Sequence, residues 1–150
     1  MASNHKPTAL KLLQGNAGKR PLPKNEPMPE PLTADAKPPE ELEGIPEAVK
    51  AWNDILPRMV GMKVMTVADV PMLVMYCEAA ADERNALEQM NIEGAVQETA
   101  TGYKQVSAWF TVRKDALARR MKILSLFGMT PSDRVKVQTV GESKKGNKFS

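Results

Sequence analysis

Prolines concentrated near the N-terminus limit how much of this 150-residue chain can pack into a folded domain. Seven of the twelve prolines lie between residues 21 and 39. Each proline removes a backbone N–H donor and restricts φ, which biases the segment toward an extended, polyproline-like conformation. We therefore predict an extended or flexible basic arm and Pro-rich linker over residues 1–44, a helical core over residues 45–137, and a disordered basic tail over residues 138–150.

Hydrophobic spacing in the core predicts helices. The first covers residues 46–60, with a bend at Pro57 and an end at Gly61, where a left-handed backbone conformation would cap the helix. The second begins at the capping signal Thr66–Asp69, although Pro71 also allows Asp69 itself to be the cap. Apolar residues then recur at steps of three and four until Gly94, which predicts a long amphipathic helix with an acidic outer face.

A short β-hairpin or loop is expected over residues 95–106, with a turn at Thr101-Gly102. A third helix should then run over residues 107–127, antiparallel to the second, and end at Gly128. Its core-facing residues are predicted to be Phe110, Leu117, Met121, Leu124 and Phe127. The predicted fold class is therefore all-α: one helix followed by a long antiparallel helical hairpin.

Charge is segregated along the chain. Residues 1–25 carry five basic and no acidic side chains, whereas residues 26–103 carry five basic and fifteen acidic ones. Residues 104–150 return to eleven basic and three acidic side chains. Basic ends around an acidic body fit a protein that contacts a polyanion such as nucleic acid with its ends, although basic tails can also serve solubility alone.

The composition argues against catalysis and against a cofactor. His5 is the only histidine, and Cys77, the only cysteine, falls on an apolar helical stripe. A structural zinc site needs about four ligands, so a His/Cys metal site is excluded by count. Two residues separate Gly15 from Gly18-Lys19, whereas a phosphate-binding P-loop has four residues between its first glycine and its Gly-Lys. We expect no catalytic residue, no metal and no cofactor, and a reducing compartment because no intramolecular disulfide can form.

The N-terminal segment contains a distinctive motif, KPTALKLLQGN over residues 6–16, followed by GKRPL over residues 18–22. This motif resembles the N-terminus of small terminase subunits of tailed bacteriophages. Ala17 departs from the proline usual before Gly-Lys-Arg. The resemblance continues at Met65–Asp69, Tyr76-Cys77, Gly102-Tyr103 and Phe127–Ser132.

The resemblance implies a non-enzymatic subunit that binds viral double-stranded DNA at the packaging-initiation region and assembles into a homo-oligomeric ring. The ring would deliver the DNA to the large terminase subunit, which carries the ATPase and nuclease, in the host cytoplasm. A small phage adaptor or accessory protein with non-specific DNA or protein binding is the alternative. No apolar run approaches the ~20 residues that cross a membrane, so no membrane partner is expected.

Basic side chains near the two ends are the candidate DNA contacts. The ten candidates are Lys6, Lys11, Lys19, Arg20, Lys24, Arg113, Lys114, Arg120, Arg134 and Lys136. Arg113 and Arg120 are seven residues apart and therefore share one face of the third helix. For the third-helix residues an alternative stays open, which is ion pairing with acidic residues of the second helix, in the same or a neighbouring subunit. Those acidic residues are Glu78, Asp82, Glu83 and Glu88.

Overall fold

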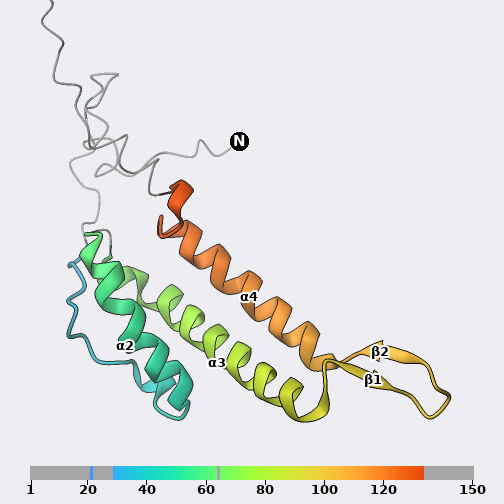
Figure 1. Ribbon diagram of the computed structural model, residues 1–150. Helices are drawn as coiled ribbons and strands as arrows, with labels where there is room; N and C mark the ends of the chain where they lie inside the picture. Colours follow the sequence, from blue (N-terminus) through green and yellow to red (C-terminus); the bar gives the residue numbers. More distant parts are fainter. Residues whose placement is uncertain (1–20, 22–28, 64, 134–150) are drawn as a thin grey trace, which may run out of the picture. The chain divides into compact units, whose positions relative to one another are not determined.

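The computed structural model describes residue 21, residues 29–63 and residues 65–133. Residues 29–127 form one compact unit built from three α-helices and a two-stranded β-hairpin. The helices are α2 (Pro46–Gly61), α3 (Val70–Glu93) and α4 (Ala108–Leu126). Figure 1 shows α3 lying between α2 and α4, and it packs against both. The predicted antiparallel helical hairpin is present as α3 and α4.

Helix α2 starts with Pro46 at its first position, where the missing N–H donor has no intrahelical partner to lose. It continues through Pro57, so this proline does not end the helix. The predicted left-handed cap at Gly61 is wrong: Gly61 is still helical, and the left-handed residue is Lys63, with φ of 58°. The buried face consists of Ala48, Trp52, Ile55, Leu56 and Met59.

The predicted start signal of the second helix is confirmed. The Thr66 backbone N–H and its Oγ1 hydroxyl both donate to the Asp69 carboxylate, at 2.9 and 2.8 Å. A 3-10 turn, η2 (Val67–Asp69), leads directly into α3. At the other end Gly94 adopts φ of 86°, and its N–H donates to the Met90 carbonyl at 2.9 Å. A positive φ explains why glycine stands there.

The predicted hairpin is also present. Strands β1 (Val96–Glu98) and β2 (Lys104–Val106) pair antiparallel, with Val96 opposite Val106 and Glu98 opposite Lys104. Gly102, with φ of 80°, closes the turn by donating its N–H to the Thr99 carbonyl at 2.8 Å. In Figure 1 the hairpin projects from the end where α3 and α4 meet. Both strands are largely exposed.

Helix α4 begins at the Ser107 cap, whose Oγ accepts the Trp109 N–H at 3.2 Å. The predicted core face of this helix is wrong at three of its five residues, and the other two, Leu124 and Phe127, are half-buried. Phe110, Leu117 and Met121 are exposed by 45%, 37% and 57%, whereas Ala116 and Ile123 are the buried residues. The side facing α3 therefore carries a small residue and two long arginine side chains rather than the largest apolar ones. Small buried residues are expected where two helices approach closely.

Part of the Pro-rich segment is anchored to the helices. The short 3-10 helix η1 (Glu40–Leu42) buries Leu42 completely, and Leu32 is also buried. The Leu32 N–H donates to the Met65 carbonyl at 3.1 Å, and the Trp52 indole N–H donates to the Ala36 carbonyl at 3.0 Å. The domain boundary at residue 44 stays a prediction, but residues 32–42 contribute side chains to the core.

Beyond α4, Gly128 has φ of 69°, as the predicted helix stop requires. The Thr130 hydroxyl oxygen accepts the Asp133 N–H at 3.3 Å, and residues 131–133 are helical. This is the capping pattern expected for a further helix at Thr130–Asp133. The rest of that predicted helix, the N-terminal motif and the predicted basic tail lie outside the described residues.

Candidate functional site: the basic residues of α4

The basic residues of α4 come closest to a functional site within the described part of the chain. Helix α3 carries five acidic and one basic side chain, and α4 carries one acidic and five basic ones. The two helices lie side by side (Figure 1). Three ion pairs, Arg113–Glu83, Arg119–Asp82 and Arg120–Glu83, link them. A cation of α4 that is already paired with α3 is not available to a partner.

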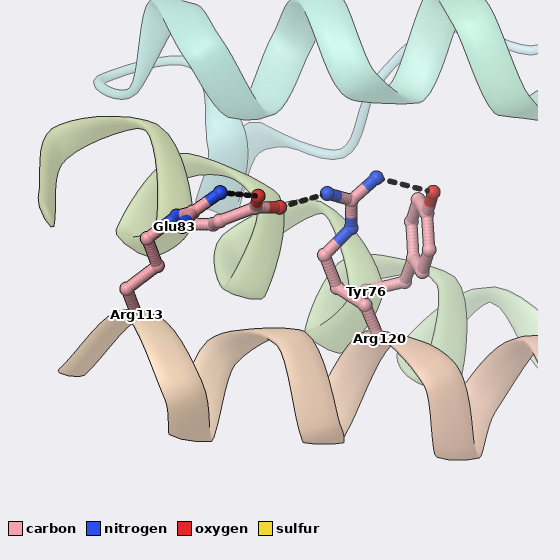
Figure 2. Close-up of polar contacts among 4 residues, drawn as sticks. All are labelled: Tyr76, Glu83, Arg113 and Arg120. Atoms are coloured by element: carbon pink, nitrogen blue, oxygen red, sulfur yellow. Dashed lines mark hydrogen bonds and ion pairs between the residues drawn. The ribbon is translucent and has the colours of Figure 1, made fainter. Parts of the chain in front are cut away.

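Arg113 and Arg120 both reach the same carboxylate on α3. Figure 2 shows Glu83 between the two guanidinium groups. Arg113 Nη2 lies 3.8 Å from Glu83 Oε1, and Arg120 Nη1 donates to Glu83 Oε2. The Glu83 side chain is only 16% exposed. One acidic residue therefore holds two cations that lie two helical turns apart.

Tyr76 completes this cluster, one heptad before Glu83. Arg120 Nη2 donates to the Tyr76 hydroxyl oxygen at 2.9 Å. The Arg120 guanidinium carbon also lies 5.0 Å from the centre of the Tyr76 ring, within the range of a cation–π contact. Together, Tyr76, Glu83, Arg113 and Arg120 form what we term the α3–α4 clamp.

Neighbouring groups keep Arg120 of the clamp charged. Burial alone would lower the pKa of Arg120, but hydrogen bonding to Tyr76, and further interactions with Tyr76 and Glu83, outweigh it and raise that pKa. The guanidinium therefore stays charged at every physiological pH. The Nε atoms of Arg113 and Arg120 are buried without a hydrogen-bond partner among the described residues. These arginines bind α3 through their terminal nitrogens only.

A second ion pair lies next to the clamp and is more exposed to solvent. Arg119 Nη2 and Asp82 Oδ2 are 2.6 Å apart, with both side chains about half exposed. Arg84 and Glu88 pair within α3, at 3.4 Å, and are more exposed still. Exposed pairs of this kind contribute about 0–1 kcal/mol. The less exposed pairing of Glu83 with Arg113 and Arg120 is therefore the main electrostatic link between the helices.

The groove beside the clamp does not suit a polyanion. This open groove, about 380 Å³ in volume, runs between α2 and α3 and is closed at one side by Arg120 of α4. Its ionisable lining consists of Glu47, Lys50, Asp54, Arg58, Glu83, Arg84 and Arg120. With four cations among three carboxylates, the lining lacks the single sign of charge that concentrates phosphates.

These contacts show which of the predicted DNA-binding residues on α4 are already paired within the subunit. Among the three that the structure describes, Arg113 and Arg120 are engaged with Glu83, as the ion-pairing alternative anticipates. Lys114 is exposed and has no ion pair within residues 29–63 and 65–133. The other seven predicted residues lie outside the described part of the chain. They are Lys6, Lys11, Lys19, Arg20, Lys24, Arg134 and Lys136.

Tyr76 is the site residue that the sequence interpretation missed, because it does not lie on the main apolar stripe of α3. Its side chain is 5% exposed. A detectable signal existed in the spacing: Tyr76 and Glu83 are seven residues apart on one helix, as are Arg113 and Arg120 on the other. In an antiparallel pair, matched seven-residue spacings bring two acceptors opposite two donors.

Cys77 lies in the interior and is poorly suited to act as a nucleophile. It is completely buried, and this burial raises the pKa of its thiol to about 12, while Arg120 lowers that pKa and Glu78 raises it by smaller amounts. A thiol of this kind stays protonated at neutral pH. Within the described ranges, no group of three or more His, Cys, Asp or Glu side chains could hold a metal ion. None of the described helices is long and apolar enough to cross a membrane.

Comparison with known proteins identifies the family. The chain shows no significant match to a curated protein or to a solved structure. Residues 48–144 match the sequence model of a family described as phage terminase, small subunit. The match covers α2 from Ala48 onward, the whole α3–α4 hairpin and the residues up to 144, which is well over half of the chain. The chain therefore belongs to the phage terminase small subunit family and has a role in phage DNA packaging.

Proposed function

We propose that this protein recognises viral DNA, assembles into a ring and presents the DNA to the large terminase subunit in the host cytoplasm. The family match over residues 48–144 is the observation that carries this proposal. The segregated charge supports it, because the basic ends can contact DNA while the acidic body contacts protein. The protein would act as a regulatory subunit, with the ATPase and nuclease on its partner.

We assign the DNA contacts to cations other than Arg113 and Arg120. Arg113 and Arg120 hold α3 and α4 together through Glu83, so releasing them to phosphates would unpair a half-buried carboxylate. The basic residues before residue 25 and after residue 133 are the remaining candidates for phosphate contacts. A ring repeats these contacts, and multivalency then converts weak phosphate binding into useful affinity.

The test replaces Lys19 and Arg20 with Ala and measures binding to phage DNA by fluorescence anisotropy over a series of salt concentrations. Each lost phosphate contact should reduce the slope of log K against log salt by about 1, and the affinity should fall at every salt concentration. The matched control replaces two exposed cations of the helical body, Lys50 and Arg58, with Ala. Equal effects of the two double variants would contradict a specific role of the N-terminal arm.

Size-exclusion chromatography with light scattering separates the ring from the adaptor alternative. A defined large oligomer that binds DNA in a salt-dependent way supports the terminase proposal. A monomer or dimer without DNA affinity supports an adaptor. Catalysis by Cys77 or His5 is tested by replacing both with Ala, and unchanged packaging in vitro would support the regulatory role.

A further inference from the structure

Helix α4 buries few of its own apolar side chains. Of its 19 residues, Ala116 and Ile123 are the buried ones. Within the described residues it packs mainly against α3. Helices in proteins derive most of their stability from packing an apolar face. The apolar side chains that α4 leaves exposed are therefore candidates for contact with a partner.

The exposed apolar side chains on one flank of α4 form a line. Phe110, Leu117 and Met121 are exposed and are spaced by seven and four residues, and the half-buried Leu124 continues the line three residues further on. With Lys114 between Phe110 and Leu117, these residues occupy the a and d positions of two heptads, the seam along which one helix packs on another. We refer to Phe110, Leu117 and Met121 as the α4 ridge. Its spacing indicates that the partner is a helix.

Cations border the α4 ridge on both sides. Lys114 lies on one side of Leu117, and Arg113 and Arg120 lie on the other, each within about 60° around the helix. Lys114 is exposed and has no ion pair within residues 29–63 and 65–133. Arg113 and Arg120 share the single carboxylate of Glu83, so one positive charge of this cluster is left over. The border of the ridge therefore carries two net positive charges.

The neighbouring acidic side chains of the described residues do not offset this charge. Asp115 is the only acidic residue of α4, and it lies about 160° around the helix from Leu117. Asp82 of α3 is paired with Arg119. The groove that Arg120 closes is lined by four cations and three carboxylates. A net positive border favours a partner that brings carboxylates.

We propose that the α4 ridge binds an amphipathic helix of a partner protein whose apolar seam is bordered by Asp and Glu side chains. In the proposed function this protein is the large terminase subunit, so the inference rests on that function and assigns a surface to the contact. The apolar seam would cover the ridge, and the carboxylates would meet Lys114 and the excess charge of the clamp. Complementary charge of this kind fixes the register of an interface and speeds association.

The observations favour this partner over DNA and over a second copy of this chain. DNA offers phosphates to the cations, but it has no apolar seam to cover the ridge. A second α4 ridge would bring two positively charged borders together, and such a juxtaposition is unfavourable. Helix α3 of a second copy is acidic, but it already packs between α2 and α4 of its own subunit and buries seven of its side chains there.

The first test compares the wild type with a ridge variant that combines Leu117→Gln and Met121→Gln. Gln is a good helix former, so α4 should persist. The matched control is Ile92→Gln, at a residue of α3 that is 77% exposed and lies outside the ridge. Surface plasmon resonance measures binding of the purified large subunit, and circular dichroism and native mass spectrometry report folding and subunit number. The ridge variant should bind about tenfold more weakly or worse, with an unchanged subunit number, and the control should bind like the wild type.

A charge reversal tests the border of the ridge. Because Lys114 is exposed, Lys114→Glu remains informative even if the ridge variant loses its helical signal. It should weaken large-subunit binding about tenfold at low salt and less at high salt. Lys122→Glu is the matched control, since Lys122 is also exposed but lies about 140° around the helix from Leu117. A synthetic helix with a leucine seam bordered by Glu should compete with the large subunit, whereas the same helix bordered by Lys should not.

The outcomes separate this proposal from the proposed function. Unchanged large-subunit binding by the ridge variant and by Lys114→Glu would overturn the proposal while leaving the function intact. A ridge variant with fewer subunits per particle would also overturn it, by showing that another copy covers the ridge. Equal competition by the acidic and basic helices would refute recognition by charge. A wild-type protein that does not bind the large subunit would instead refute the proposed function, and this proposal with it.

Discussion

Asp82 and Glu83 are neighbours on α3 that each pair with an arginine of α4, yet neutralising them should have very different consequences. The comparison uses Asp82→Asn and Glu83→Gln, which preserve shape and remove one charge each. Asp82 has one partner, Arg119, and its side chain is 49% exposed. Glu83 has two partners and its side chain is 16% exposed. The two residues therefore differ in exposure and in the number of arginine partners, although they are adjacent in the sequence.

The magnitudes follow from this difference. A half-exposed ion pair contributes about 0–1 kcal/mol, so Asp82→Asn should cost less than about 1 kcal/mol. Removing one member of a buried pair costs about 3–5 kcal/mol, because the remaining charge stays desolvated. Arg113 and Arg120 keep 34% and 29% exposure, and Gln retains an acceptor oxygen, which lowers the expected cost. We expect Glu83→Gln to lower the free energy of unfolding by about 2 kcal/mol.

Urea unfolding followed by circular dichroism at 222 nm measures both values at one fixed protein concentration, since assembly would otherwise shift the apparent stability. For a unit of this size, about 2 kcal/mol corresponds to a fall in Tm of roughly 8–16 °C. The Asp82→Asn effect should shrink further in 1 M salt, whereas the Glu83→Gln effect should persist. Equal losses for the two variants would refute the assignment of Glu83 as the main link between α3 and α4.

Three further measurements probe single interactions. Trp52→Phe removes the indole bond to the Ala36 carbonyl and should cost about 1 kcal/mol by urea unfolding, with the anchored segment becoming more sensitive to limited proteolysis. Thr66→Ala removes the cap of η2 and α3 and should cost about 0.5–2 kcal/mol in the same assay, whereas Thr66→Ser should cost little. The folded-state pKa of the Cys77 thiol is raised to about 12 from about 9, so its protonated form contributes stability below about pH 9. That contribution to the free energy of unfolding should disappear as the pH rises from 9 to 12, at about 1.4 kcal/mol per pH unit. Comparing the pH profiles of stability of the wild type and Cys77→Ala isolates it. Parallel profiles for the two proteins would contradict this prediction.

The features that the sequence predicted well are those set by local backbone chemistry. Pro46 can start a helix, Gly94 can adopt a positive φ, and Thr66 with Asp69 can cap a helix without help from the rest of the fold. The hairpin turn at Gly102 belongs to the same class. Each of these signals acts over a few residues, so the start of α2, both ends of α3 and the turn of the β-hairpin can be placed without the tertiary structure.

The clamp could not be predicted in the same way, because it depends on the register between two helices. Four acidic residues of α3 were candidates for pairing with α4, and only the packed hairpin selects Asp82 and Glu83 among them. Glu88 instead pairs with Arg84 on its own helix. The buried position of Tyr76 has the same origin, since it depends on a guanidinium arriving from another helix.

The error in the phase of α4 has a physical cause that bears on assembly. Periodicity identifies the most apolar stripe of a helix, but it does not say whether that stripe is covered by the same chain or by another one. Here the strongest stripe, Phe110, Leu117 and Met121, is exposed, and the side facing α3 combines Ala116 and Ile123 with paired arginines. A monomer that kept such a ridge in water would carry the kind of exposed apolar surface that normally marks an interface. Leu117→Asp should therefore leave a folded, helical subunit and weaken assembly with a partner instead. Loss of the helical circular dichroism signal in dilute solution would show that α4 packs within the subunit through this stripe.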